Sequence, residues 1–296
     1  MRWSAVLIAF VSLDCCASNS NPDEAACLQA AAPARPGFDA RTRIELPSLR
    51  LCGFPMQKTD VAESADVVVW EVGDAAWARA AAMHQPGAVI VARKTSGTWD
   101  VTKRLLAPEP AAYDGFGVRL ASDGVWVAVM TRRTRRVWVF ELGNLDKPGQ
   151  EIAGVNGFAR AIAAYGNDLI VGGDGEARIY RKDASWNLVE RIPAPSGAPD
   201  AFSGDIAASG DLVAATTSGV NTGDGIALPG RVDVFRRTSS GWQWEGRLSP
   251  NATESPFGQD CCVSVAKGQV LVMMGEAHWK FINDGQAWRL APGSVP

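Results

Sequence analysis

Three stretches of the chain follow one pattern: Trp99–Leu105 (WDVTKRL), Trp186–Ile192 (WNLVERI) and Trp242–Leu248 (WQWEGRL). In each, an Arg lies five residues after the first Trp, an aliphatic residue follows the Arg, and a Pro comes within a few residues. A shorter copy, Trp288–Pro292 (WRLAP), lies near the C-terminus. Agreement at three positions in three separate segments indicates one structural unit that is repeated along the chain.

A longer repeat surrounds these segments, and it opens with a Phe close to a Gly. This Phe recurs 42 to 62 residues apart, at Phe54, Phe116, Phe158, Phe202 and Phe257. An Ala-containing strand follows each Phe, and two short β-branched runs come next, separated by Gly, Asp and Ser turns. The second strands are expected at 67–69, 125–127, 169–171, 212–214 and 270–272, and the third at 88–91, 137–140, 178–180, 232–235 and 279–282.

Four short antiparallel strands repeated at this period are typical of a β-propeller. A four-stranded sheet cannot cover both of its own faces, whereas packing like sheets against one another buries them. We therefore predict an all-β fold, a β-propeller of five blades with four antiparallel strands each, over residues 43–296. An unaccompanied strand-like segment, Arg43–Pro47, suggests a closed ring in which one end of the chain completes the blade begun by the other.

The repeats resemble FG-GAP repeats, the blades of integrin α-chain heads and of many exported bacterial proteins. The likeness rests on Phe116-Gly117 and Phe257-Gly258, each of which leads into a strand ending in Ala, and covers about residues 43–292. In calcium-binding members, the loop between the second and third strands carries a DxDxDG-type cage. The corresponding loops here lack three alternating carboxylates, so we expect no metal and no cofactor; they are Thr131–Arg136, Gly172–Glu176, Thr216–Pro229 and Met274–His278.

Residues 1–16 have the features of an export signal, because Arg2 precedes a short apolar run, Trp3–Leu13. This run is too short to span a bilayer. Cys15 and Cys16 follow as at a bacterial lipoprotein cleavage site and are lipidation candidates; ordinary secretion is the alternative. Residues 17–42, rich in Ala, Pro, Asn and Ser, predict a flexible tether. We expect an exported protein, either a lipoprotein of the outer membrane or facing the periplasm, or a secreted one.

Export implies an oxidising compartment, in which disulfides are expected. Repeats one and five carry extra residues, Pro55–Asp60 and Gln259–Cys262, which would meet in a closed ring. We expect Cys52 to pair with Cys261 or Cys262 and to close the ring, with Cys27 taking the remaining partner; a vicinal bridge between Cys261 and Cys262 is the alternative.

The candidate binding residues lie on one face. Because strands alternate in direction, the starts of the first strands and the turns between second and third strands share a face, called here the variable-loop face. Arg132, Arg133, Arg135 and Arg136 crowd one turn of it, and their guanidinium groups suit phosphate, sulfate or carboxylate; a solvated turn is the alternative. Further candidates there are Trp77, His84, His278, Glu276 and Asp224.

The two histidines, His84 and His278, are expected as exposed residues in turns between second and third strands, because no spacing supplies a third zinc ligand; a metal or acid–base site with Glu276 is the alternative. The Trp residues at the repeat position (Trp99, Trp186, Trp242 and Trp288) are expected to pack between blades. With 29 Lys and Arg against 32 Asp and Glu, the formal charge is −3, which argues against nucleic-acid binding.

The sequence contains no GxSxG elbow, no HExxH pair and no phosphate-cradling loop. We therefore expect a non-enzymatic scaffold that presents its variable-loop face to a protein or glycan partner at the cell envelope. The alternative is a hydrolase that cleaves glycans with a pair of carboxylates from the same face. Its candidate acids are Asp74, Asp174, Asp224, Asp260 and Glu276.

Overall fold

The computed structural model describes the chain from Arg50 onward, with gaps. The described residues are 50–51, 54–55, 61–63, 67–72, 88–95, 98–109, 114–195, 202–217, 220–221, 227–228, 230–249, 262–266, 268–274, 277–292 and 294. The predicted export signal and tether lie outside these residues, as do Cys27, Cys52 and Cys261. Cys262 opens a strand, but its side chain is outside the described part.

Every regular element among the described residues is a β-strand. The described residues from Arg50 to Ile152 form one compact unit, which holds two four-stranded antiparallel sheets and a short hairpin. The hairpin joins β1 (Arg50–Leu51) and β2 (Phe54–Pro55). Blade 1 contains β3 (Val61–Glu63), β4 (Val67–Val72), β5 (Ala88–Thr95) and β6 (Thr98–Leu105). Blade 2 contains β7 (Arg119–Ser122), β8 (Trp126–Met130), β9 (Val137–Glu141) and β10 (Gln150–Glu151).

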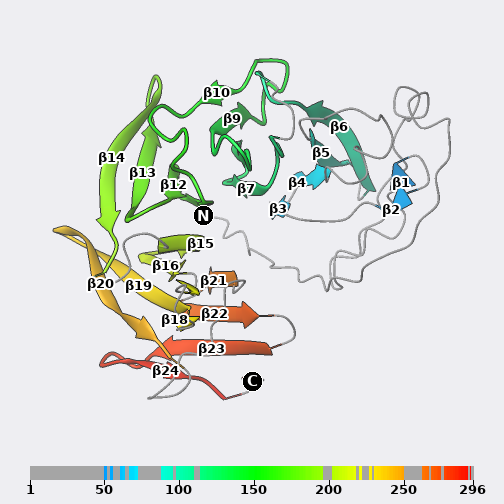
Figure 1. Ribbon diagram of the computed structural model, residues 1–296. Coiled ribbons are helices and arrows are strands. Elements are labelled where there is room, and N and C mark those ends of the chain that lie inside the picture. Colours follow the sequence, from blue (N-terminus) through cyan, green and yellow to red (C-terminus); the bar gives the residue numbers. More distant parts are fainter. Residues whose placement is uncertain are drawn as a thin grey trace. The chain divides into compact units, whose positions relative to one another are not determined.

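Residues 153–296 form the second compact unit, with three more four-stranded sheets (Figure 1). Blade 3 contains β11 (Ala161–Tyr165), β12 (Asp168–Gly172), β13 (Glu176–Lys182) and β14 (Trp186–Pro193). Blade 4 contains β15 (Phe202–Ser209), β16 (Leu212–Thr217), β19 (Arg231–Thr238) and β20 (Gly241–Leu248). Blade 5 contains β21 (Cys262–Ala266), β22 (Gln269–Met274), β23 (Ala277–Asn283) and β24 (Trp288–Leu290).

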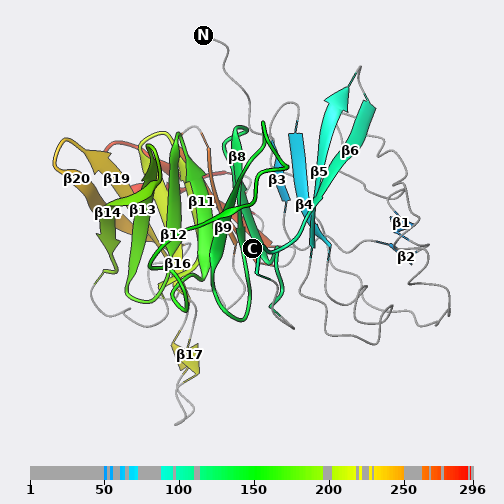
Figure 2. The ribbon, with the colours of Figure 1, turned by 90° about the horizontal axis from the view of Figure 1, so that it is seen from above.

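A short hairpin, β17 (Val220–Asn221) with β18 (Ala227–Leu228), interrupts blade 4 between its second and third strands. Figure 2 shows this hairpin projecting away from the sheet of its own blade. It belongs to the loop for which the sequence alone predicted no strand.

The predicted fold class is confirmed: the chain is an all-β β-propeller with five blades of four antiparallel strands. Each predicted second and third strand overlaps a strand of the structure. Blade 2, whose repeat lacks the Trp, has a fourth strand of only two residues, β10. Blade 5 takes its four strands from one continuous stretch that ends at Leu290, and the segment Arg43–Pro47 lies outside the described residues.

Within each unit, neighbouring blades share hydrophobic cores. Strand β16 is buried along its whole length and divides its side chains between two of them. Val213 and Ala215 belong to a cluster with Ile170 and Ile179 of blade 3, whereas Leu212 and Ala214 belong to a cluster with blade 5. A strand covered on both faces reads as a continuous apolar run, which is why these segments lack the alternation of a half-exposed strand.

The tryptophans at the repeat position pack as predicted in the second unit. Trp242 is 7% exposed and meets the ring of Tyr165 in blade 3 edge-on, with the ring centroids 5.5 Å apart. The Trp288 indole N–H donates to Glu245 Oε2 in blade 4 at 3.2 Å. Each of these residues therefore joins its own blade to the preceding one. Trp186 is also buried, and the side chain of Trp99 lies outside the described part.

Glu245 is the acceptor at the junction of blades 4 and 5. Besides Trp288, it accepts hydrogen bonds from Asn283 Nδ2 at 2.8 Å and from Arg236 Nε at 2.8 Å. Its side chain is 21% exposed, so these donors lie in a half-buried environment. Removing the carboxylate would leave three polar groups short of a partner.

We expect Glu245→Ala to lower the free energy of unfolding by about 2 kcal/mol, because unpaired half-buried donors retain their desolvation cost. Glu245→Gln, which keeps an acceptor, should cost less. Lys147→Ala is the matched control, since the exposed Lys147–Glu141 pair at 3.4 Å should contribute about 0.5 kcal/mol or less. Urea denaturation measures all three, and equal losses for Glu245→Ala and Lys147→Ala would contradict the prediction.

Candidate functional site

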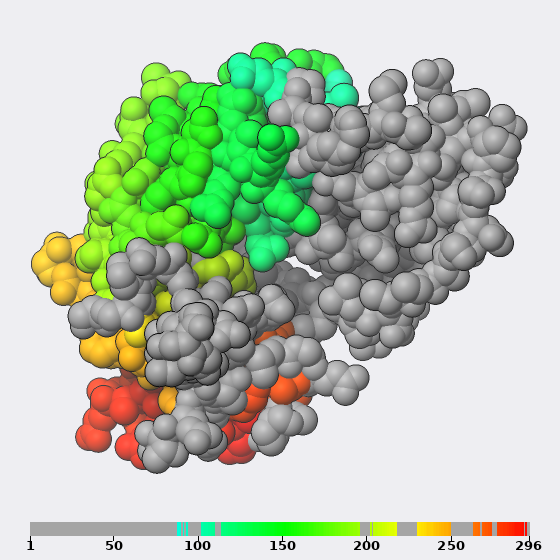
Figure 3. Space-filling model, viewed as in Figure 1, coloured from blue at the N-terminus to red at the C-terminus, as the bar shows by residue number. Residues whose placement is uncertain are grey.

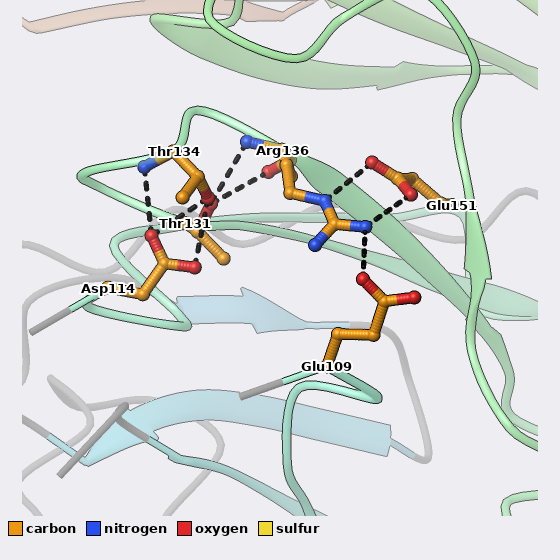
Figure 4. A network of polar contacts seen from close by, with 6 residues as sticks. All are labelled: Glu109, Asp114, Thr131, Thr134, Arg136 and Glu151. Atoms are coloured by element: carbon orange, nitrogen blue, oxygen red, sulfur yellow. Dashed lines mark hydrogen bonds and ion pairs between the residues drawn. The ribbon is translucent and has the colours of Figure 1, made fainter. Parts of the chain in front are cut away.

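The arginine-rich turn Thr131–Arg136, called here the arginine turn, joins β8 to β9 and is organised by one buried acid, Asp114 (Figure 4). Asp114 is 2% exposed. Its Oδ1 accepts the Thr134 N–H at 2.8 Å, and the Thr134 hydroxyl lies 2.8 and 2.9 Å from its two carboxylate oxygens. Its main-chain carbonyl accepts the N–H groups of Arg132 at 2.6 Å and Arg133 at 3.2 Å. Asp114, which precedes β7, thus holds the main chain of the turn through its carboxylate and its carbonyl group.

Thr131 closes the turn from the other side. Its side chain is fully buried, its N–H donates to the Arg136 carbonyl at 2.9 Å, and its Oγ1 accepts the Arg136 N–H at 2.9 Å. The hydroxyls of Thr131 and Thr134 are 2.8 Å apart. Arg135 adopts a left-handed backbone with φ of 51°, which costs a non-glycine residue about 1 kcal/mol. The hydrogen bonds around Asp114 and Thr131 offset that cost and give the turn a single shape.

Arg136 supports the turn instead of facing solvent. Its Nε and Nη2 each donate to Glu151 at 2.6 Å, and Nη2 also donates to Glu109 at 2.8 Å. The guanidinium carbon lies 4.7 Å from the centre of the Trp138 ring. The hydrogen bonds with Glu151 raise the pKa of Arg136, and Arg136 in turn lowers the pKa of Glu151. Two carboxylates therefore balance this charge.

The other three arginines of the turn differ in exposure. The side chains of Arg132 and Arg133 are exposed, and that of Arg135 is half-buried. The carboxylate of Asp114 is buried under the turn, whereas the guanidinium-bearing side chains of Arg132 and Arg133 are exposed. Such forks bind carboxylate, sulfate or phosphate through paired hydrogen bonds. The arrangement can hold an anionic group without a large rearrangement of the main chain.

The structure separates the remaining candidates. His278 lies in strand β23, opposite Met273 of β22, so the expectation that it belongs to the preceding turn is wrong. The reason is that the ladder between these strands continues to Ala277. Asp174 forms an ion pair with Arg160 of its own blade. The other candidates of the variable-loop face lie outside the described residues: Asp74, Trp77, His84, Asp224, Asp260 and Glu276.

Within the described part of the chain, no three His, Cys, Asp or Glu side chains are placed to hold one metal ion. The same part contains no helix that is long and apolar enough to cross a membrane. The expectations of no metal and no cofactor remain predictions.

Sequence reasoning missed two residues that matter. Asp114 precedes the repeat Phe116 by two positions and lies 20 residues from Thr134, so no local motif connects it to the turn. Trp244 lies two residues after the buried Trp242, yet 53% of it is exposed. A comparison between repeats could have singled out Trp244, because the corresponding positions of the other repeats hold the smaller residues Val101 and Leu188.

No protein-family model matches the chain, and no curated protein matches it. Similar solved structures include apo AztD from Citrobacter koseri, with 15% identity and a TM-score of 0.48, where the match covers 82% of this chain and 61% of AztD. Kluyveromyces lactis Hsv2p has 12% identity and a TM-score of 0.48, over 80% of this chain and 72% of Hsv2p. A nidogen/laminin complex contains a chain with 9% identity and a TM-score of 0.47, where the match covers 79% of this chain and 78% of that one.

This chain therefore spans about three-fifths of the length of AztD. Likenesses at these identities concern the fold alone and support no argument about ligand or activity. Membership of the FG-GAP family stays a prediction.

Proposed function

We propose that this protein is an exported, non-enzymatic binding scaffold of the cell envelope, which holds an acidic group of a protein or glycan partner at the arginine turn. The observation that carries the proposal is the fixed main chain of this turn. The buried Asp114 holds it through four donors, while Arg132 and Arg133 remain exposed. A preorganised site loses less conformational entropy when a partner binds.

The charges of the turn favour an anion. Arg136 is balanced by Glu109 and Glu151, and its side chain is 17% exposed. The exposed guanidinium groups of Arg132 and Arg133 add positive charge to the surface that a partner meets. Anions are attracted to such a surface at low ionic strength, and salt screens the attraction over about 10 Å at 0.1 M.

Three carboxylates of the described residues have a lowered pKa. A glycosidase needs one carboxyl group whose pKa is raised, so that it can act as an acid. Salt bridges and hydrogen bonds instead lower the pKa of Asp146, Glu151 and Asp284. These three acids therefore suit structural ion pairs and turns. Four candidate acids of the glycan hydrolase, Asp74, Asp224, Asp260 and Glu276, lie outside the described residues, so the hydrolase remains the alternative.

We expect the double variant Arg132→Ala/Arg133→Ala to weaken binding of an acidic partner about tenfold to a hundredfold, because each lost charge-assisted hydrogen bond contributes about 1.5 kcal/mol. The measurements are affinity capture from envelope extract, a glycan array and retention on heparin at increasing salt. Arg289→Ala is the matched control, since Arg289 is exposed on a different blade and its loss should leave binding unchanged.

Capture and retention that survive the double variant would remove the arginine turn from the proposal. Release of new reducing ends from any bound glycan would instead establish the hydrolase. Cell fractionation, with mass spectrometry of the mature N-terminus, tests export and separates an acylated cysteine from simple secretion.

A further inference from the structure

Trp244 of blade 4 has an exposed ring that is held in place. Among the tryptophans whose side chains the structure describes, it is the most exposed, at 53%. Its indole N–H donates to Asp233 Oδ1 at 3.1 Å, and Asp233 is itself fully buried. The hydrogen bond restricts the ring while part of its apolar surface stays in contact with water. A restricted, solvent-facing aromatic ring is a feature of ligand-binding surfaces, because little entropy is lost when a ligand stacks on it.

The position of Trp244 follows from strand geometry. Trp242 and Trp244 lie on the same face of β20, since side chains alternate along a strand. Trp242 packs against Tyr165 of blade 3, whereas Trp244 lies two residues further along the outer strand of the blade. The gold-coloured residues around β20 reach the molecular surface in Figure 3. The ring is therefore at the outer margin of the blade, beyond the hydrophobic core.

Two guanidinium groups share the carboxylate beneath the ring. Arg247 Nε lies 3.2 Å from Asp233 Oδ1, and Arg231 Nε lies 3.4 Å from Asp233 Oδ2. The Arg247 side chain is 41% exposed, and that of Arg231 is 15% exposed. Burial lowers the pKa of Arg231, and the neighbouring charge of Arg247 lowers it further. These three residues carry two positive charges and one negative charge.

The cluster therefore has one excess positive charge. Among the described residues, the buried atoms Arg231 Nε, Arg231 Nη2 and Asp233 Oδ2 have no hydrogen-bond partner. Arg247 shares the single carboxylate of Asp233 with the half-buried Arg231, and its own side chain is 41% exposed. An anionic group bound to the exposed fork of Arg247, beside Trp244, would balance the second positive charge.

We propose that Trp244 and Arg247, supported by Asp233 and Arg231, form a site for an acidic saccharide. An indole ring can stack on the C–H face of one sugar ring, and the Arg247 fork matches a carboxylate or a sulfate on that ring. A simple anion would leave the Trp244 ring unused, and a neutral sugar would leave the excess charge uncompensated. The site rests on the proposed binding function and adds a ligand class and a second location, on a blade other than that of the arginine turn.

The test is titration of the full-length protein with defined saccharides, followed by tryptophan fluorescence and calorimetry. A carboxylated probe (tetragalacturonate), its neutral methyl ester and a sulfated heparin-derived tetrasaccharide separate the sources of negative charge. We expect binding of at least one acidic probe and at least tenfold weaker binding of the neutral ester. Whichever acidic probe binds identifies the anionic group that the Arg247 fork accepts.

We expect Trp244→Ala to weaken that binding about tenfold and Trp244→Phe to weaken it less, because Phe keeps an aromatic face. Arg247→Lys keeps the charge beside Asp233 but loses the fork, so it should also weaken binding. Leu290→Ala, an exposed apolar residue of β24, is the control and should have no effect. Thermal unfolding of each variant confirms that it is folded.

Unchanged affinity of folded Trp244→Ala, equal binding of the neutral ester, or no binding of either acidic probe would each overturn this site. If the same saccharides are lost in Arg132→Ala/Arg133→Ala but retained in Trp244→Ala, the proposed function stands and the site on blade 4 fails. Loss in the Trp244 variant with full retention in the double arginine variant supports the site on blade 4 and removes the arginine turn.

Discussion

Asp114→Ala is expected to lower the free energy of unfolding by about 3 kcal/mol and to weaken binding at the arginine turn at the same time. The carboxylate is buried and accepts both the N–H and the hydroxyl of Thr134, so its removal leaves half-buried donors unpaired, at about 1 to 3 kcal/mol each. The left-handed backbone of Arg135 would lose the side-chain support of Asp114 at the neighbouring Thr134, while the hydrogen bonds between Thr131 and Arg136 would remain. A loss of this size is a large share of the stability of a typical domain.

Asp123→Ala is the matched control for this prediction. Asp123 lies in the same blade and accepts the N–H groups of Val125 and Trp126 at 2.8 and 2.9 Å in a local turn, where water can replace it. We expect a loss of about 1 kcal/mol and unchanged binding. Urea denaturation and heparin retention measure the two effects. If Asp114→Ala loses no more stability than Asp123→Ala, the turn is held by other contacts.

Phe202→Ala is expected to cost about 3 to 5 kcal/mol, the range for removing a large aromatic side chain from a packed core. Phe202 is fully buried and meets Phe235 edge-on, with the ring centroids 5.9 Å apart and an interplanar angle of 78°. Phe116 and Phe140 repeat this geometry in blade 2, at 6.0 Å and 78°. The pair of rings is therefore a recurring element of blade packing.

Phe158→Ala provides the comparison at the same position of another repeat. Phe158 is half-buried, and the Arg178 guanidinium carbon lies 3.7 Å from its ring centre. A cation–π contact therefore covers this ring, in place of the edge-on aromatic contact of Phe202. We expect a loss of about 1 to 2 kcal/mol, since less apolar surface returns to water. Equal losses for Phe158→Ala and Phe202→Ala would show that the repeat position, and not burial, sets the cost.

The strands were predictable because their signals are local. Buried runs such as Leu169–Val171 are bounded by Gly and Asp residues, and the alternation of a strand needs only neighbouring residues to specify it. The outer strands were recognisable from the shared Trp, Arg and aliphatic positions. The hairpin β17–β18 was missed because its strands have two residues each, too few to show any period.

The exposure and the ion-pair partners of each charged side chain were not predictable, because the partners are distant in sequence. Arg132 and Arg136 belong to one run of arginines, yet Arg136 pairs with Glu109 and Glu151, which lie 27 and 15 positions away. In the same way, Trp242 and Trp244 belong to one heptapeptide but differ in exposure. Trp242 is buried because it packs against Tyr165 of blade 3, whereas Trp244 is exposed. The sequence predicted His278 in a turn, but strand β23 begins at Ala277. Where a strand begins depends on its pairing with the neighbouring strand, which the residues around His278 do not specify by themselves.

The sequence by itself determined the blade: its four strands, its period and the apolar residues that must be covered. These follow from side-chain alternation and turn chemistry, which act over a few residues. Only the tertiary structure decided which arginines and tryptophans face the solvent and which acids lie beneath them. That choice depends on residues brought together from different strands and blades, where burial and pairing set the cost of each charge.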